Sequence, residues 1–157
     1  MKRLAALLVL ASSLAAQSPG TVQPTVLMAP IGEVKLQPGK TAKVELDFRI
    51  PANFHINSSK PKSPLLIPTS LKLEASKPLE IAAIQYPPGE DQNFPFSPNE
   101  KLSVYSGDFE IVTLLKAPPS AKGSRYHVSG ELYYQACDRN ACYPPKKLAV
   151  NFDVSVR

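Results

Sequence analysis

The sequence predicts an all-β sandwich, and three observations carry this prediction. Residues 42–50 alternate apolar and polar side chains with a period of two, as half-buried strands do, and residues 109–115 form a further strand-like run. Seventeen prolines interrupt the chain, so the uninterrupted stretches have the length of short strands. No window keeps a helical apolar period over three turns. Short strands that recur at roughly 10-residue spacing between turn signals favour a sandwich of two sheets.

The strands can be placed in order along the chain. In residues 42–50 the inner face is formed by Val44, Leu46 and Phe48, because side chains two positions apart lie on the same side of a strand. Residues 86–103 are rich in proline and polar residues, and we expect a long irregular loop there. Such a loop in a compact domain is more often functional than idle. The expected strands are residues 34–36, 42–50, 54–56, 71–74, 79–84, 109–115, 126–134 and 148–154.

The N-terminal residues have the organisation of an export signal. A basic start at Lys2 and Arg3 is followed by an apolar run and then by small residues, so residues 1–16 are expected to be a cleaved signal peptide. Residues 17–24 then form a flexible lead-in, and residues 25–157 form one domain. No later segment approaches the roughly 18 apolar residues that a membrane span needs. We therefore expect a periplasmic or secreted protein without a membrane span.

The charge pattern excludes nucleic acid as an expected partner. The chain has a formal net charge of +5, which falls to about +3 without the two basic residues of the signal peptide. Its lysines are scattered and form no block of about five or six like charges. A mildly basic surface accounts for this composition without a nucleic-acid function.

The only two cysteines, Cys137 and Cys142, have four residues between them and lie between the last two expected strands. These strands are predicted to form a hairpin, with the cysteines opposite each other at the mouth of its loop. Directly opposed residues lie about 4.5 Å apart at Cα, near the short end of the range that a disulfide accepts. Closing so small a loop stabilises the fold by only about 2 kcal/mol. The pair is therefore a redox-active disulfide, a structural disulfide or a metal site.

Three segments resemble a known family, the N-terminal periplasmic domain of the thiol:disulfide interchange protein DsbD. Residues 134–137, Tyr-Gln-Ala-Cys, and residues 142–145, Cys-Tyr-Pro-Pro, resemble its cysteine signature. Residues 54–57 with 64–69 resemble its early region, and residues 102–111 resemble the strand of its cap loop. The resemblance runs from about Val22 to Arg157 and implies an immunoglobulin-like antiparallel β-sandwich with a long cap loop over a hairpin disulfide.

The resemblance also implies which side chains surround the disulfide. The family's cap carries an aromatic residue immediately before a tyrosine that matches Tyr105, whereas this chain has Val104 at that position. Either Val104 forms a thinner cap, or Phe96 or Tyr105 takes the shielding role. The expected surroundings of the two catalytic cysteines are Tyr134, Gln135, Arg139, Tyr143 and Pro144.

The chemistry that the resemblance implies is thiol–disulfide exchange, in which a thiolate attacks one sulfur of a disulfide and forms a mixed disulfide. We expect Cys142 to bind the partner and Cys137 to be the resolving cysteine. The expected partners are periplasmic thioredoxin-fold proteins and a membrane-embedded thiol reductase. The protein would be a monomer and a component of a protein-disulfide oxidoreductase system, with no cofactor beyond the disulfide and no metal.

Two other classes of function stay open at this point. The first is an exported binding module in which the disulfide is purely structural. The second is a Cu(I) carrier, because thiolates suit this soft ion and His55 or His127 could add a ligand. Two sulfurs alone make a poor zinc site, since structural zinc usually has four protein ligands.

Overall fold

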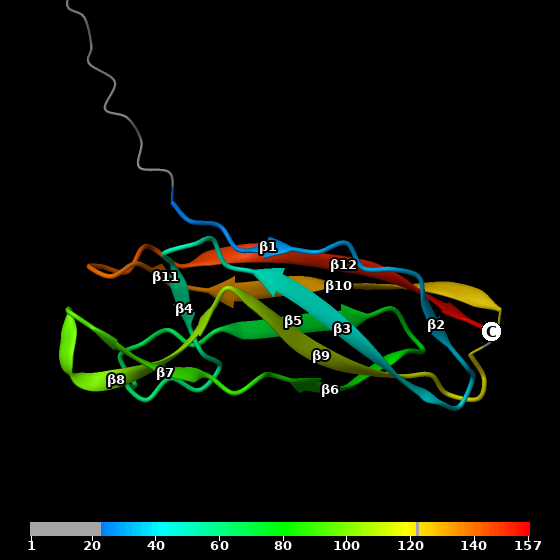
Figure 1. Ribbon diagram of the computed structural model, residues 1–157. Helices are drawn as coiled ribbons and strands as arrows, with labels where there is room; N and C mark the ends of the chain where they lie inside the picture. The colour runs from blue at the N-terminus through cyan, green and yellow to red at the C-terminus, as the bar shows by residue number, and fades with distance from the viewer. Residues whose placement is uncertain (1–22, 122) are drawn as a thin grey trace, which may run out of the picture.

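The computed structural model describes residues 23–121 and 123–157, and these residues form strands and loops without a helix (Figure 1). The expected signal peptide, residues 1–16, and residues 17–22 of the expected lead-in lie outside the described residues. No helix in the described ranges is long and apolar enough to cross a membrane. The strands are β1 (Leu27–Met28), β2 (Val34–Leu36), β3 (Thr41–Arg49), β4 (His55–Asn57), β5 (Ser70–Ala75), β6 (Glu80–Gln85), β7 (Glu90–Phe94), β8 (Ser97–Ser106), β9 (Asp108–Lys116), β10 (Ser124–Tyr134), β11 (Ala136–Cys137) and β12 (Lys146–Val156).

Two four-stranded sheets form the sandwich. One has the order β1-β3-β9-β6 and the other the order β2-β12-β10-β5. Neighbouring strands are antiparallel, except that β2 runs parallel to β12. The two last long strands, β10 and β12, pair along their whole length as the expected hairpin. The all-β, immunoglobulin-like sandwich that the sequence predicts is confirmed.

The core lies between the two sheets, where the period-two pattern places it. Along β3, Val44, Leu46 and Phe48 are buried and the side chains between them are exposed. From the facing sheet, Val128 of β10 and Val150 of β12 are fully buried in the same apolar cluster. Full burial of each such side chain stabilises the fold by about 1.5–3 kcal/mol. The strands that carry this core are therefore a rigid platform for the loops at each end.

A third sheet, of order β11-β4-β8-β7, extends one end of the sandwich, at the opposite end from the C-terminus (Figure 1). Successive side chains of a strand point to opposite faces, so this sheet has two distinct faces. One face continues the main core through Ile56 and Tyr105. The other face carries Cys137, together with His55 from the neighbouring strand.

The structure corrects the expectation that residues 86–103 are irregular. Most of this segment is a hairpin of β7 and β8, whose tip contains Pro95 and Phe96. Its strands lie outside the sandwich, and apart from Tyr105, which reaches the main core, their buried apolar side chains form a small separate cluster of Phe94, Leu102 and Val104. Most of its other side chains face solvent, so the hairpin has no alternating apolar signal in the sequence.

The two expected strands at residues 71–74 and 79–84 are present as β5 and β6. They belong to opposite sheets, because β5 pairs with β10 and β6 pairs with β9. The chain therefore crosses the sandwich between them and does not form a hairpin there.

Candidate functional site

Cys137 and Cys142 form a disulfide at the mouth of the short loop between β11 and β12. Their Cα atoms lie 3.9 Å apart, and the two residues form an isolated antiparallel bridge. They are therefore directly opposed, as the hairpin prediction required. No other cysteine occurs in the chain.

Asp138 organises the loop that the disulfide closes. Its carboxylate accepts hydrogen bonds from the backbone N–H groups of Asn140, at 2.7 Å, and Ala141, at 2.9 Å. The hydroxyl of Tyr143 donates a third hydrogen bond to the same carboxylate, at 2.8 Å. These bonds, with the backbone N–H groups first, lower the pKa of Asp138 below its ordinary value. An ionised carboxylate therefore lies next to Cys137 in sequence.

The two sulfur-bearing residues differ in their access to solvent. Cys137 is 0% exposed, whereas Cys142 lies on the exposed side of the loop. Thiol–disulfide exchange requires an approach of the attacking thiolate to one of the sulfurs. Cys142 is the residue that such a thiolate can reach without rearrangement of the sheet.

His55 of β4 is the cross-strand partner of Cys137. Directly opposed residues have their side chains on the same face, with Cβ atoms about 4.5–5.5 Å apart. His55 is only 4% exposed, and its Nε2 atom has no hydrogen-bond partner among the described residues. Burial lowers the pKa of His55 to about 4, and the nearby Asp138 carboxylate raises it in part. The imidazole is therefore neutral at physiological pH.

A column of aromatic rings covers the other side of His55. The ring of Phe94 stacks on His55 with 4.0 Å between centroids, and the ring of Phe96 stacks on Phe94 at 5.4 Å. Phe94 is buried, whereas Phe96 at the hairpin tip is 37% exposed. The hairpin of β7 and β8 thus reaches the disulfide through His55. Phe94 is not among the site residues that the sequence predicts.

The two other expected cap residues lie on different faces of β8. Val104 is fully buried beside Phe94 in the small cluster of the hairpin. Tyr105 points to the main core, stacks on Phe109 at 5.0 Å, and accepts a hydrogen bond from the backbone N–H of Ser59 at 3.1 Å. Phe96 and Val104 therefore belong to the hairpin that contacts His55. Tyr105 anchors the base of that hairpin to the main core and to the backbone of Ser59.

The expected surroundings of the disulfide fall into three groups. Tyr143 and Gln135 hold the loop, because the Gln135 amide donates to the Tyr143 carbonyl at 3.1 Å. Arg139 and Pro144 are exposed. Tyr134 faces the main core, and its hydroxyl accepts a hydrogen bond from the backbone N–H of residue 26 at 3.0 Å.

The tyrosine that follows Cys142 also packs on the strand of His55. The ring of Tyr143 meets the ring of Phe54 edge to face, with 6.0 Å between centroids. Aromatic pairs of this geometry contribute about 0.5–1.5 kcal/mol beyond their buried area. The contact holds the exit of the disulfide loop against the start of β4.

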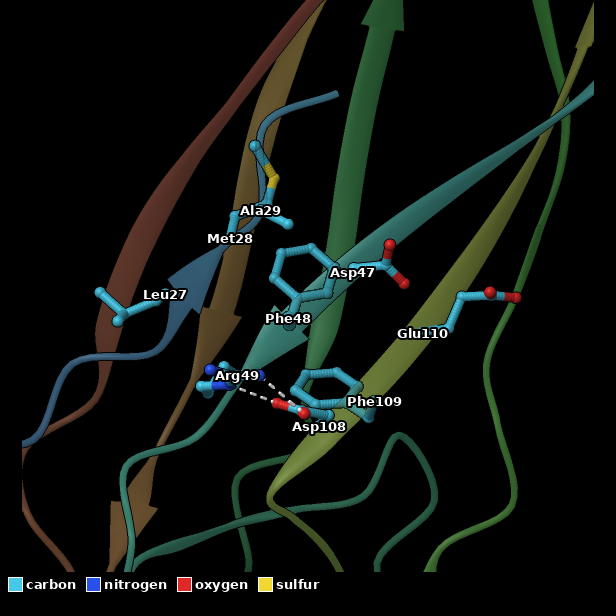
Figure 2. A pocket seen from close by; sticks show the side chains of 9 residues that line it. All are labelled: Leu27, Met28, Ala29, Asp47, Phe48, Arg49, Asp108, Phe109 and Glu110. Carbon is cyan, nitrogen blue, oxygen red and sulfur yellow. Dashed lines mark hydrogen bonds and ion pairs between the residues drawn. The ribbon is translucent and has the colours of Figure 1, made fainter. Parts of the chain in front are cut away.

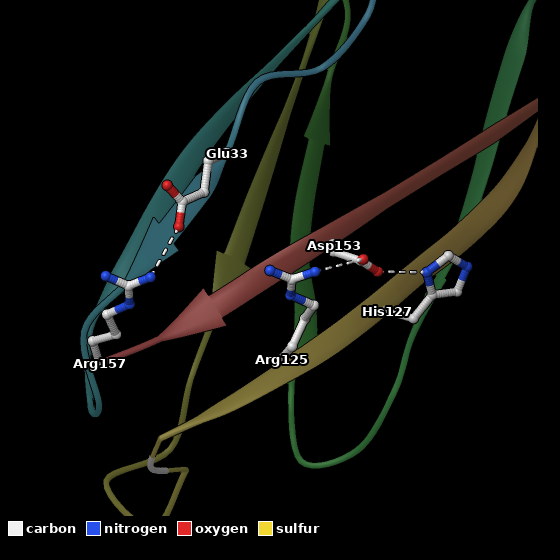
Figure 3. Close-up of polar contacts among 5 residues, drawn as sticks. All are labelled: Glu33, Arg125, His127, Asp153 and Arg157. Atoms are coloured by element: carbon white, nitrogen blue, oxygen red, sulfur yellow. Dashed lines mark hydrogen bonds and ion pairs between the residues drawn. The ribbon is translucent and has the colours of Figure 1, made fainter.

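The second histidine lies far from the cysteines. His127 on β10 is exposed, and its Nδ1 atom lies 2.9 Å from Asp153, which Arg125 approaches at 3.9 Å (Figure 3). Tyr134 lies seven positions after His127 along β10, which is about 23 Å along a strand. Residues 23–121 and 123–157 contain no group of three or more His, Cys, Asp or Glu side chains that could hold a metal ion. The structure does not bring His127 to the two sulfurs.

A surface hollow is lined by residues other than the two cysteines. It has a volume of about 580 Å³ and lies on β1, β3 and β9, where Leu27, Phe48 and Phe109 line it beside the ion pair of Arg49 with Asp108 (Figure 2). None of the expected site residues lines it. The chemistry of the cysteines therefore takes place at a projecting loop and outside this hollow.

Three solved structures of low sequence identity are similar to this chain. The DsbD N-terminal domain of Neisseria meningitidis in the reduced form is 22% identical over 71% of this chain and 75% of that chain, with a TM-score of 0.41. The complex between the DsbD N-terminal and PilB N-terminal domains from Neisseria meningitidis is 20% identical over 71% of this chain and 73% of that chain, with a TM-score of 0.41. A type I cohesin from Pseudobacteroides cellulosolvens is 14% identical over 81% of this chain and 89% of that chain, with a TM-score of 0.50. No curated protein matches the chain.

The family model matches a longer part of the chain than these three structures do. The model described as "Thiol:disulfide interchange protein DsbD, N-terminal" matches residues 24–153. This range includes both sheets of the sandwich, the hairpin of β7 and β8, and both cysteines. The expected resemblance is confirmed, and it connects the Cys137–Cys142 disulfide with thiol–disulfide exchange in general. The chain belongs to the family of the N-terminal domain of the thiol:disulfide interchange protein DsbD.

Proposed function

We propose that this protein is a periplasmic electron relay, which exchanges electrons with other redox proteins through the Cys137–Cys142 pair. The observation that carries the proposal is the unequal exposure of the two residues. Cys142 is exposed and can be attacked, whereas Cys137 is fully buried and has as its cross-strand neighbour His55, on which the aromatic rings of the hairpin stack. A purely structural disulfide needs no such arrangement.

The exchange proceeds in two steps. A thiolate of the partner attacks the Cys142 sulfur, the bond between Cys142 and Cys137 breaks, and Cys137 leaves with the electron pair and takes up a proton. A second thiol of the partner then attacks the partner's own sulfur in the mixed disulfide. This releases Cys142, so the partner leaves oxidised by two electrons and this protein holds a dithiol. The reverse sequence passes the electrons to an acceptor.

The partners that fit this site are proteins with an accessible pair of thiols. The disulfide lies in a loop that projects from one end of the sandwich (Figure 1). Periplasmic thioredoxin-fold proteins and a membrane-embedded thiol reductase meet this requirement, as the family resemblance implies. The expected signal peptide at residues 1–16 would deliver the protein to the compartment in which they act.

The hairpin of β7 and β8 acts as a cover in this proposal. Phe94 and Phe96 exclude small thiols from the side of His55, and Val104 fixes Phe94 from below. A docking partner displaces the tip, where Phe96 is partly exposed. The cover thereby makes exchange depend on docking.

The reduction potential of the pair tests the function. The purified protein is equilibrated in thiol buffers, and alkylated thiols are counted by mass. A midpoint in the range of known exchange proteins, about −120 to −270 mV, supports the relay. A midpoint below about −300 mV marks a structural disulfide and favours the binding module. Stoichiometric Cu(I) retained by the reduced protein would instead favour the carrier.

A further inference from the structure

The buried position of Cys137 creates a chemical difficulty for the proposed exchange. When a partner attacks Cys142, the leaving sulfur is that of Cys137, which is 0% exposed. A thiolate in apolar surroundings is unfavourable, and its thiol pKa rises. The neighbouring Asp138 carboxylate opposes a second negative charge. The site therefore needs a hydrogen-bond donor that faces the Cys137 sulfur.

His55 is the described side chain whose position and chemistry fit this need. It is opposite Cys137 in the register of β11 and β4, so both side chains lie on one face of the sheet. Three buried side-chain atoms of the described residues lack a hydrogen-bond partner, namely His55 Nε2, Asn57 Oδ1 and Thr113 Oγ1. Only the imidazole combines a capacity to donate with the position opposite Cys137.

The surroundings of His55 also hold its ring in place. Phe94 stacks on one side of the imidazole at 4.0 Å, and the exposed fraction of His55 is 4%. A buried polar atom without a partner costs about 1–3 kcal/mol, so its retention needs a reason. The oxidised protein leaves Nε2 without a partner, and opening of the disulfide supplies one.

We propose that His55 is a further residue of the exchange site, and that its Nε2–H group donates a hydrogen bond to the Cys137 sulfur when the disulfide opens. This inference rests on the proposed function. The bond between Cys142 and Cys137 breaks, the new bond joins Cys142 to the partner, and the electron pair stays on Cys137. The neutral imidazole stabilises this thiolate until a proton from solvent converts it to the thiol.

Two substitutions separate this role from simple packing. His55→Phe keeps a ring for Phe94 to stack on and removes the N–H donor. His55→Gln keeps an N–H donor and removes the ring. Each is combined with Cys142→Ala, and the pKa of the remaining Cys137 thiol is measured by the ultraviolet absorbance of the thiolate. The exchange rate of each single variant with a reduced thioredoxin is measured in parallel, with His127→Gln as the control.

We expect His55→Phe to raise the pKa of Cys137 by about one unit and to slow exchange about tenfold, as loss of a hydrogen bond to a charged group does. His55→Gln should stay close to the wild type in both measurements. The reverse ranking would show that His55 only packs against Phe94, and equal values in both variants and the wild type would also overturn the inference.

The wild-type protein provides an independent measurement if both variants are impaired or fold poorly. The nitrogen resonances of the His55 imidazole are compared by NMR in the oxidised and reduced states. A shift of the Nε2 resonance on reduction supports the hydrogen bond, and unchanged resonances overturn it. Failure of the proposed function is distinguishable, because the wild type itself would then not exchange with thioredoxin.

Discussion

The ring of Phe94 lies 4.0 Å from the ring of His55 in a nearly parallel stack, and His55 is the cross-strand partner of Cys137. Residues from three strands thus follow one another in space, from the hairpin through β4 to the disulfide on β11. The arrangement places an apolar ring on the imidazole that neighbours the buried half of the disulfide. Its consequences for reactivity and stability can be measured separately.

Replacement of Phe94 by alanine should open this cover. We expect Phe94→Ala to speed reduction of the disulfide by dithiothreitol about tenfold, and to lower the free energy of unfolding by about 3 kcal/mol. Leu102→Ala is the matched control, because Leu102 is buried in the same cluster but is not stacked on His55. Equal rates of reduction in the two variants would show that Phe94 only packs.

The hydroxyl of Tyr105 fastens the root of the hairpin. It accepts a hydrogen bond from the N–H of Ser59 at 3.1 Å and donates to the carbonyl of Pro87 at 3.0 Å, so it joins the segments before and after β5 and β6. Tyr105→Phe leaves both groups without this partner. We expect a loss of about 1–3 kcal/mol in denaturant unfolding.

Tyr133→Phe is the control for this measurement, because Tyr133 is only partly buried and lies on the other face of β10 from Tyr134. Its unfolding free energy should stay within about 0.5 kcal/mol of the wild type, as for most surface changes. Equal losses in the two variants would contradict an anchoring role for Tyr105.

The long strands of the sandwich were predictable from the sequence, because each has one face in the core. Val44, Leu46 and Phe48 alternate with exposed residues and identify β3 without further information. The two-residue strand β1 was not expected, because Leu27 and Met28 are adjacent apolar residues without alternation. Local pattern therefore predicts strands well where burial is regular and poorly at the edges.

The site was predictable only in part. The spacing of Cys137 and Cys142 and their family resemblance identified the disulfide, whose two residues are directly opposed. The stack of Phe94 on His55 was not predictable, because it depends on the pairing of β4 with β8 and of β8 with β7. A contact between residues so distant in the chain leaves no periodic signal in a single sequence.

Burial of His55 should make the stability depend on pH. Its pKa is about 4 in the folded protein, compared with an ordinary value of 6.5. Between these values the unfolded chain binds a proton that the folded protein does not, so stability falls as pH decreases through this window. The loss is about 1.4 kcal/mol for each pH unit, and about 3 kcal/mol in total.

Denaturant unfolding between pH 7 and pH 4 measures this loss, with His55→Phe as the matched variant. The variant should show a smaller loss over the same window. Asp138 does not affect this comparison. Its pKa in the folded protein is lowered from 3.8, so its contribution to the free energy of unfolding is lost only below the pH range in which His55 titrates. Parallel pH profiles for the two proteins would show that His55 is not buried in the neutral form.

The unequal exposure of the cysteines predicts which single variant captures a partner. In Cys137→Ala the exposed Cys142 remains, and this protein then has no second thiol that could resolve a mixed disulfide formed on it. In Cys142→Ala the remaining Cys137 is fully buried beside His55 and cannot reach a partner's sulfur. The partner is a thioredoxin that keeps only its exposed cysteine, supplied as a mixed disulfide with a small thiol, so that attack by Cys142 releases the small thiol. We expect Cys137→Ala to accumulate at least about tenfold more protein–protein mixed disulfide, seen as a band that dithiothreitol removes. Equal accumulation in both variants would place the two sulfurs in equivalent positions during exchange and contradict the assignment of Cys142 as the attacked residue.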